Sequence, residues 1–224
     1  MTITTTTPVR TLTTLSWVPE FARGLVRDLR VRWALEEAGL PYQVKLVSFE
    51  EKQLPAYRSL QPFAQVPAYQ EDGLTLFESG AIAHHIAAGS PALMPSDAGE
   101  RSRTLSWMFC ALNTIEPAVA ALAEIDLFNA DAGWAKERRP AVLDGLENRL
   151  ADLDRVLQGQ EYLLDRFTVA DILMATVLNI LRHTQLVAGH PALHAYHQRC
   201  LARPAAVKAL ANQMAVYSPT AGAA

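Results

Sequence analysis

Apolar and polar positions in the first third of the chain follow two different periods. Residues 10–15 and 42–47 alternate in character and contain β-branched side chains, so each segment predicts a strand. The segment between them has apolar side chains three and four residues apart, which predicts a helix with one buried face. These apolar residues are Val31, Ala34, Leu35 and Ala38. Gly39 suits the position just after such a helix, because glycine readily adopts a positive φ.

A β-hairpin and a further helix are predicted in the next segment. Residues 55–60 form a short helical piece, after which a strand is entered through Val66–Pro67. An X–Pro bond has lost most of its trans preference, and we predict a cis peptide at this position. Asp72–Gly73 is a strong signal for a tight turn between two strands. The pattern then predicts a helix from Ser79 to Ala88.

The second part of the chain has a helical pattern throughout. Glycine, proline and serine residues in 89–98 indicate a linker. The helical segments beyond it are 100–128, 134–157, 168–181, 191–200 and 204–214. The element order predicts an α/β domain with a small mixed, thioredoxin-like sheet, followed by an all-helical bundle. The expected domains are residues 1–88, the linker 89–98, and residues 99–224.

Composition narrows the possible partners of the protein. The chain has 224 residues, of which 50% are hydrophobic, with a net charge of -3. This balance supports a packed core and gives no global basic field for nucleic acid. We find no signal-peptide pattern and expect no membrane partner. The two cysteines, Cys110 and Cys200, have neither metal-ligand spacing nor a disulfide framework, so we expect a reducing cytoplasm and no metal.

Four short motifs together resemble the cytosolic glutathione S-transferase family, bacterial type. They are Gln-Val-Pro at 65–67, Glu-Ser at 78–79, Phe-Thr-Val-Ala-Asp at 167–171 and Ala-Arg-Pro-Ala-Ala-Val at 202–207. Each motif is weak alone, but the set is specific and covers the whole layout. The resemblance implies transfer of the glutathione thiolate to a small, mostly apolar electrophile. It also implies a cytoplasmic homodimer, with no cofactor beyond glutathione as co-substrate.

The resemblance also implies where glutathione binds. The main chain of Val66, before Pro67, would pair with the glutathione cysteine, while Glu78 and Ser79 would hold the γ-glutamyl end. A helix start has free N–H groups and a positive dipole end, which suit a carboxylate. Glu78 and Ser79 could instead form an ordinary helix cap, but beside the hairpin we favour ligand binding. Two more candidates for carboxylate contacts are Gln65 and Lys52.

The usual thiolate donor of the family is not evident here. That donor is a Tyr, Ser or Cys after the first strand, and residues 17–28 contain none of these. Arg27 and Arg23 are candidate electrostatic donors, because a guanidinium is always charged. Ser16 is the competing hydroxyl, and backbone N–H groups are a further alternative.

The arginines of this segment also have a purely structural interpretation. They could form a solvated helix face with Glu36 and Glu37. For Arg23 and Arg27 we weigh the two interpretations equally, whereas for Arg30 and Arg32 we favour the solvated face.

Two other functions remain open on the same fold. One is a glutathione-dependent reductase, peroxidase or isomerase, and the other is a glutathione-binding protein without catalysis. Thr168 and Asp171 fit a capping box, which is a folding device. His190, His194 and His197 share a helical face, but without a carboxylate or cysteine ligand we interpret them as surface residues.

Overall fold

The structure is a computed structural model and describes residues 9–217. Contacts divide these residues into two units, one made of residues up to 86 and from 208 onward, the other of residues 87–207. This grouping places the end of the last helix with the amino-terminal unit. The domain boundaries expected from the sequence stay a prediction, and their outermost parts, residues 1–8 and 218–224, lie outside the described residues.

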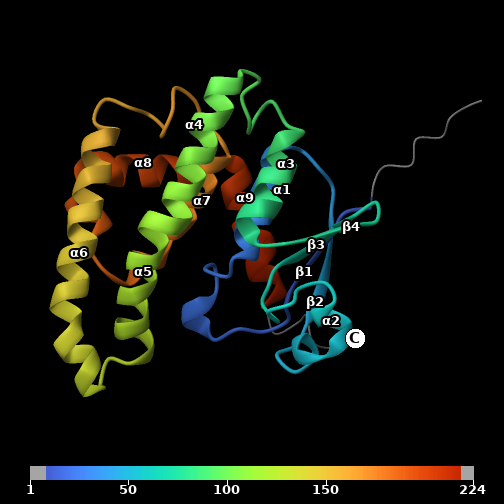
Figure 1. Cartoon of the computed structure of the whole chain (residues 1–224), viewed down its shortest axis with the longest axis horizontal. Coiled ribbons are helices and arrows are strands. Elements are labelled where there is room, and N and C mark those ends of the chain that lie inside the picture. The colour runs from blue at the N-terminus through green and yellow to red at the C-terminus, as the bar shows by residue number, and fades with distance from the viewer. Residues whose placement is uncertain (1–8, 218–224) are drawn as a thin grey trace, which may run out of the picture. The chain divides into compact units, whose positions relative to one another are not determined.

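The amino-terminal unit is built on a four-stranded mixed sheet with strand order β2-β1-β3-β4 (Figure 1). The strands are β1 (Thr11–Leu15), β2 (Gln43–Val47), β3 (Ala68–Glu71) and β4 (Leu74–Phe77). β1 and β2 are parallel, while β3 runs antiparallel to both β1 and β4. Parallel neighbours need a crossover connection, which helix α1 (Asp28–Glu37) provides. The predicted thioredoxin-like pattern is confirmed.

Helices cover both faces of this sheet. On one face, Tyr57 of α2 (Pro55–Arg58) packs with Val47 and Ala68. On the other, His85 of α3 (Ser79–Ala88) lies against the ring of Tyr69. Figure 1 shows α1 beside α3, away from α2. Two short 3₁₀ helices, η1 (Glu20–Ala22) and η2 (Glu51–Gln53), lie in the connections.

The predicted turns adopt the expected backbone geometry. Asp72 and Gly73 have φ values of 47° and 82°, and two positive values are typical of a type I′ hairpin. Gly39 ends α1 with φ 66°, and the N–H of Leu40 bonds the carbonyl of Leu35 at 2.9 Å. The Val66–Pro67 peptide is cis, as predicted.

The second unit is helical throughout the described residues. Its elements are α4 (Ala98–Phe109), η3 (Cys110–Ile115), α5 (Glu116–Ala123), η4 (Glu124–Phe128), α6 (Gly133–Leu157), α7 (Val169–Leu178), η5 (Asn179–His183), η6 (Val187–Gly189), α8 (Pro191–Leu201) and the start of α9 (Pro204–Val216). Every residue of α7 is buried, so this helix lies in the core of the unit. The predicted capping box is present, with the Asp171 carboxylate accepting from the N–H of Thr168 at 2.8 Å.

A long apolar helical stretch runs from Ala98 to Phe128. Among the described residues it is the one helix long and apolar enough to span a membrane, and 44% of its most apolar window is buried in the protein. Core helices can meet the same length and composition criteria, so this is weak evidence for a membrane segment. The expectation of no membrane partner stays a prediction.

Candidate functional site

Two buried side chains build the loop that leads into β3. The Gln61 side chain, 2% exposed, accepts bonds from the N–H groups of Phe63 at 2.7 Å and Gln65 at 3.0 Å. The Tyr57 hydroxyl donates to the Gln65 carbonyl at 2.6 Å. Burial raises the pKa of Tyr57 to about 12, so the phenol keeps its proton as donor. The Gln65 main chain is thereby fixed, while its side chain is exposed.

Val66 offers its main chain next to this loop. It is half-buried, and no backbone hydrogen bond within residues 9–217 involves it. Backbone groups without partners in the fold are available to pair with a ligand. An extended peptide beside the start of β3 can therefore bond Val66 in the manner of an added strand.

The junction between β4 and α3 carries the other predicted glutathione residues. Glu78 is exposed and has φ 66°, an uncommon conformation for a residue with a side chain. Ser79 is 4% exposed, and its hydroxyl oxygen accepts a hydrogen bond from Nη1 of Arg30 at 3.2 Å. The serine hydroxyl therefore still has its own proton to donate to an acceptor.

The interpretation of Arg30 and Arg32 as a solvated helix face is wrong. Arg30 is 3% exposed and Arg32 is 1% exposed. Arg30 bonds Ser79 of α3, whereas Arg32 forms a 2.7 Å ion pair with Asp28 one turn earlier. The i,i+4 spacing of Asp28 and Arg32 was a local signal for that pair. No local signal identified Ser79 as the partner of Arg30.

The three predicted thiolate donors lie on the connection between β1 and α1. Ser16 is half-buried directly after β1, and its N–H bonds the Val47 carbonyl at 3.0 Å. Arg23 is half-buried after η1, and Arg27 is exposed at the residue preceding α1. Because Arg30 bonds Ser79, the start of α1 lies close to the start of α3. The structure thus brings Arg27 and the predicted γ-glutamyl site to neighbouring helix starts.

Lys52 lies among aromatic side chains near the same connection. Its ammonium nitrogen is 4.9 Å from the ring centroid of Phe49. Phe49 in turn meets Trp17 edge-on, with 6.4 Å between ring centroids. Trp17 directly follows Ser16, so these rings connect Lys52 to the segment with the predicted donors.

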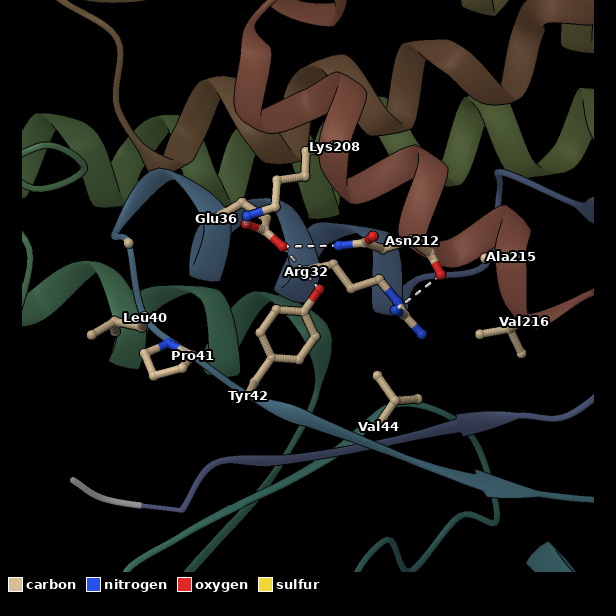
Figure 2. A pocket seen from close by; sticks show the side chains of 11 residues that line it. Arg32, Glu36, Leu40, Pro41, Tyr42, Val44, Lys208, Asn212, Ala215 and Val216 are labelled. Carbon is tan, nitrogen blue, oxygen red and sulfur yellow. Dashed lines mark hydrogen bonds and ion pairs between the residues drawn. The ribbon is translucent and has the colours of Figure 1, made fainter. Parts of the chain in front are cut away.

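A groove of about 620 Å³ lies elsewhere in this unit, between α1, β2 and α9 (Figure 2). None of the predicted glutathione or thiolate residues lines it. Its polar side chains bond one another: Glu36 accepts from Tyr42 at 3.3 Å and Asn212 at 3.0 Å, and pairs with Lys208 at 2.7 Å. These contacts attach the end of α9 to α1, which the sequence did not indicate.

The histidines near α8 and the free cysteine Cys110 differ in their surroundings. Within residues 9–217, no group of three His, Cys, Asp or Glu side chains is placed to hold a metal ion. His190 pairs with Glu147 at 3.0 Å. His197 is buried against the Ala175 carbonyl, so its interpretation as a surface residue is wrong. Cys110 is a half-buried free thiol whose pKa burial raises, which disfavours a reactive thiolate.

The fold and the site together define a class of protein. A thioredoxin-like unit offers a free main chain before a cis-proline and a serine at a helix start, and a helical unit accompanies it. The sequence matches the family model described as the N-terminal domain of glutathione S-transferase over residues 21–88. It matches the model of the C-terminal domain of glutathione S-transferase over residues 114–204. The chain belongs to the glutathione S-transferase family.

Relatives and solved structures agree with this assignment. Glutathione S-transferase 4 of Zea mays is 30% identical over 207 residues, covering 87% of this chain and 90% of that protein. A glutathione transferase from Burkholderia graminis, solved with two glutathione molecules bound per subunit, is 29% identical with a TM-score of 0.78, and covers 90% of this chain and 87% of its own. One from Pseudomonas putida, with one glutathione disulfide per subunit, is 25% identical with the same TM-score, over 90% of each chain.

Proposed function

We propose that the protein is a glutathione transferase that conjugates the glutathione thiolate to small apolar electrophiles. The observation that carries this proposal is the bond between Arg30 and Ser79, because it joins the helix start suited to the γ-glutamyl end with the segment predicted to face the thiol. Similar proteins from Burkholderia graminis and Pseudomonas putida were solved with glutathione or its disulfide bound, which supports the choice of ligand.

Each predicted residue has a role in this proposal. The main chain of Val66, before Pro67, pairs with the cysteine of glutathione as an added strand would. Ser79 donates its remaining proton to the γ-glutamyl carboxylate, and the free N–H groups of the α3 start add to this contact. Glu78, exposed at the same junction, accepts from the γ-glutamyl ammonium group. The cation of Lys52 and the exposed amide of Gln65 bind the peptide at its other carboxylate.

The chemistry requires a lowered pKa of the bound thiol. A free thiol has a pKa of about 8.5, and lowering it by two units takes roughly 2.7 kcal/mol of preferential thiolate stabilisation. Arg27, Arg23 or backbone N–H groups before α1 can supply this as charge-assisted hydrogen bonds. Ser16 is the alternative donor. An arginine cannot accept the thiol proton, so the proton leaves to water or to a glutathione carboxylate.

We also propose a cytoplasmic homodimer. Phe109 and Phe128, on the long apolar stretch of the helical unit, are 60% and 66% exposed. Large exposed apolar side chains on one stretch are typical of an interaction surface, and two-fold dimers are the commonest soluble assembly. Sedimentation at micromolar concentration should give twice the monomer mass of 24.6 kDa. A sedimenting species of monomer mass would contradict this part of the proposal.

Two measurements made together test the function. Calorimetry measures glutathione binding, and an assay with an aryl halide and glutathione measures conjugation. Binding with conjugation supports the transferase, whereas binding without conjugation supports the non-catalytic protein. Binding together with activity towards a disulfide, a peroxide or an isomerisable substrate, and none towards the aryl halide, supports the other enzymatic alternative.

A further inference from the structure

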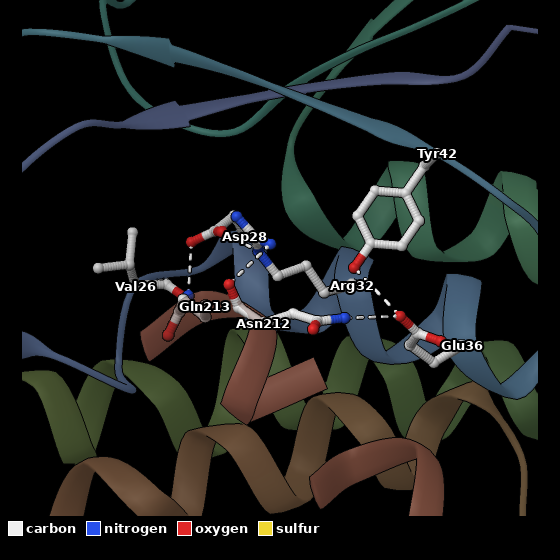
Figure 3. Close-up of polar contacts among 7 residues, drawn as sticks. All are labelled: Val26, Asp28, Arg32, Glu36, Tyr42, Asn212 and Gln213. Atoms are coloured by element: carbon white, nitrogen blue, oxygen red, sulfur yellow. Dashed lines mark hydrogen bonds and ion pairs between the residues drawn. The ribbon is translucent and has the colours of Figure 1, made fainter. Parts of the chain in front are cut away.

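The end of α9 contacts the segment in which the thiolate donors are predicted. Residues from 208 onward belong to the same unit as the sheet. The amide nitrogen of Gln213 donates to the Val26 carbonyl at 3.1 Å and to the Asp28 carboxylate at 2.6 Å (Figure 3). Val26 and Asp28 are two residues apart, with Arg27 between them. A single side chain of α9 therefore holds the backbone on one side of Arg27 and the side chain on the other.

This contact lies in the interior of the unit. Gln213 and Asp28 are both 0% exposed, and Asp28 also pairs with Arg32 at 2.7 Å. In a poorly hydrated interior, a hydrogen bond to a charged group is stronger than at the surface, and its loss leaves a polar group without a partner. Arg27 itself is exposed. The position of this exposed residue is thus set by buried neighbours.

The apolar side of the same helix end reaches a second part of the site. Tyr217 packs in one cluster with Leu15 and Val18, and the half-buried side chains around this cluster include Val26 and Val66. Val66 is the residue proposed to pair with glutathione. The end of α9 therefore contacts both the segment before α1 and the strand entry at Val66.

We infer that Gln213 is a positioning residue for the thiolate site, acting through Val26 and Asp28 on the orientation of Arg27 and the N–H groups around it. This inference rests on the proposed function, since it concerns the same site. Asp28, Arg32 and Arg23 are charged groups that act on the Tyr217 hydroxyl at this helix end. Gln213 carries no charge, so it acts by geometry rather than by its own field.

The experiment measures the thiolate absorbance of glutathione bound to the purified full chain over a range of pH. The midpoint of this titration is the apparent pKa of the bound thiol. In Gln213→Met, which keeps the side-chain length but has no N–H donor, the midpoint should rise by about one pH unit, a tenfold loss of thiolate below the midpoint. Glutathione affinity measured well below the midpoint, where the bound peptide is a thiol, should change less than about threefold, because the side chain acts through the segment and not on the peptide.

Asn212→Ala is the matched control. This residue is adjacent on the same helix, and its side chain bonds Glu36 rather than the segment before α1. Its backbone carbonyl, which accepts from Arg32, is kept in the variant. The midpoint should equal that of wild type. If Gln213→Met does not fold, Gln213→Asn keeps an amide that is one methylene shorter, and its midpoint should rise in the same direction.

The outcomes separate the two proposals. One outcome is a lowered midpoint in wild type that is the same in Gln213→Met and Gln213→Asn. That result overturns the positioning role and keeps the proposed function. An equal rise in Asn212→Ala also overturns it, because general loosening of α9 would then explain the effect. No glutathione binding in wild type, or a bound thiol with an ordinary midpoint, overturns the proposed function, and the positioning role with it.

Discussion

Two helices of this protein each have a fully buried aspartate in their first turn, and the two carboxylates have different kinds of hydrogen-bond partners. Asp171 at the start of α7 accepts from the N–H groups of Thr168 and Leu163 and from the Tyr196 hydroxyl, at 2.8–3.1 Å. Asp28 at the start of α1 is bonded by the side chains of Arg32 and Gln213.

The difference concerns where the partners lie in the sequence. Burial raises the pKa of both carboxyl groups, so each needs hydrogen bonds to hold its charge. Two partners of Asp171 lie within eight residues, whereas Gln213 is 185 residues from Asp28. A locally satisfied aspartate caps its own helix. An aspartate that bonds a residue far away in the sequence connects its helix start to another part of the chain. Here the helix start at Asp28 adjoins the proposed site.

The largest expected effect comes from removing the locally satisfied aspartate. Asp171→Ala removes the acceptor of four buried donors, so the free energy of unfolding should fall by roughly 3–5 kcal/mol. Urea unfolding followed by circular dichroism measures it. The exposed ion pair of Asp152 provides the control, and Asp152→Ala should change stability by less than about 0.5 kcal/mol. Similar losses in both variants would contradict the role assigned to the capping box.

A titratable group beside α7 should give the helical unit an acid-sensitive stability. Burial, with a smaller contribution from His194, lowers the pKa of His197 to about 4. Between pH 6.5 and 4 the unfolded chain binds this proton and the folded protein does not, so stability falls as the pH falls. The slope is about 1.4 kcal/mol per pH unit, which amounts to roughly 3 kcal/mol over this pH range.

Stability measured against pH checks this contribution. His197→Gln should remove that part of the slope, whereas the exposed His194→Gln should keep most of it. A wild-type slope that persists in His197→Gln would assign the acid sensitivity to other groups.

Substitution of Asp28, whose partner Gln213 is distant in the sequence, should cost less stability than substitution of Asp171 but should also affect the site. Asp28→Asn leaves the guanidinium of Arg32 buried without its counter-ion, while the amide oxygen still accepts from Gln213. We expect the free energy of unfolding to fall by roughly 2–3 kcal/mol. We also expect the pKa of bound glutathione to rise, so that less of it is thiolate. Asp72→Asn in the exposed turn is the control and should alter neither. Unchanged stability in Asp28→Asn would show that the ion pair contributes nothing net.

The smallest expected effect concerns the affinity for glutathione. Ser79→Ala removes a hydroxyl proposed to donate to glutathione and should weaken binding by roughly 1–2 kcal/mol. Calorimetry measures this, with Ser59→Ala as a control, since that exposed hydroxyl bonds the Ala56 carbonyl of its own helical turn. Equal affinities of wild type and Ser79→Ala would remove Ser79 from the site.

Most of the fold could be predicted because its signals are local. The helix expected at residues 79–88 has those bounds, and the turn at Asp72–Gly73 forms as its residues require. The burial of Arg30 could not be predicted, because its partner Ser79 is 49 residues away. The contacts of Gln213 are more distant still. The thiolate donor stays a prediction for the same reason: the familiar hydroxyl is absent from residues 17–28, and its replacement depends on tertiary placement.

The assignment of residues from 208 onward to the amino-terminal unit has a consequence for biosynthesis. A ribosome delivers the strands and α1 long before it delivers Gln213, so Asp28 leaves the exit tunnel well ahead of one of its partners. Domains generally fold as units, the earlier ones first. We therefore expect the nascent sheet to complete its packing only after residues from 208 onward have been translated, and a chain stalled before residue 208 to lack an ordered segment ahead of α1.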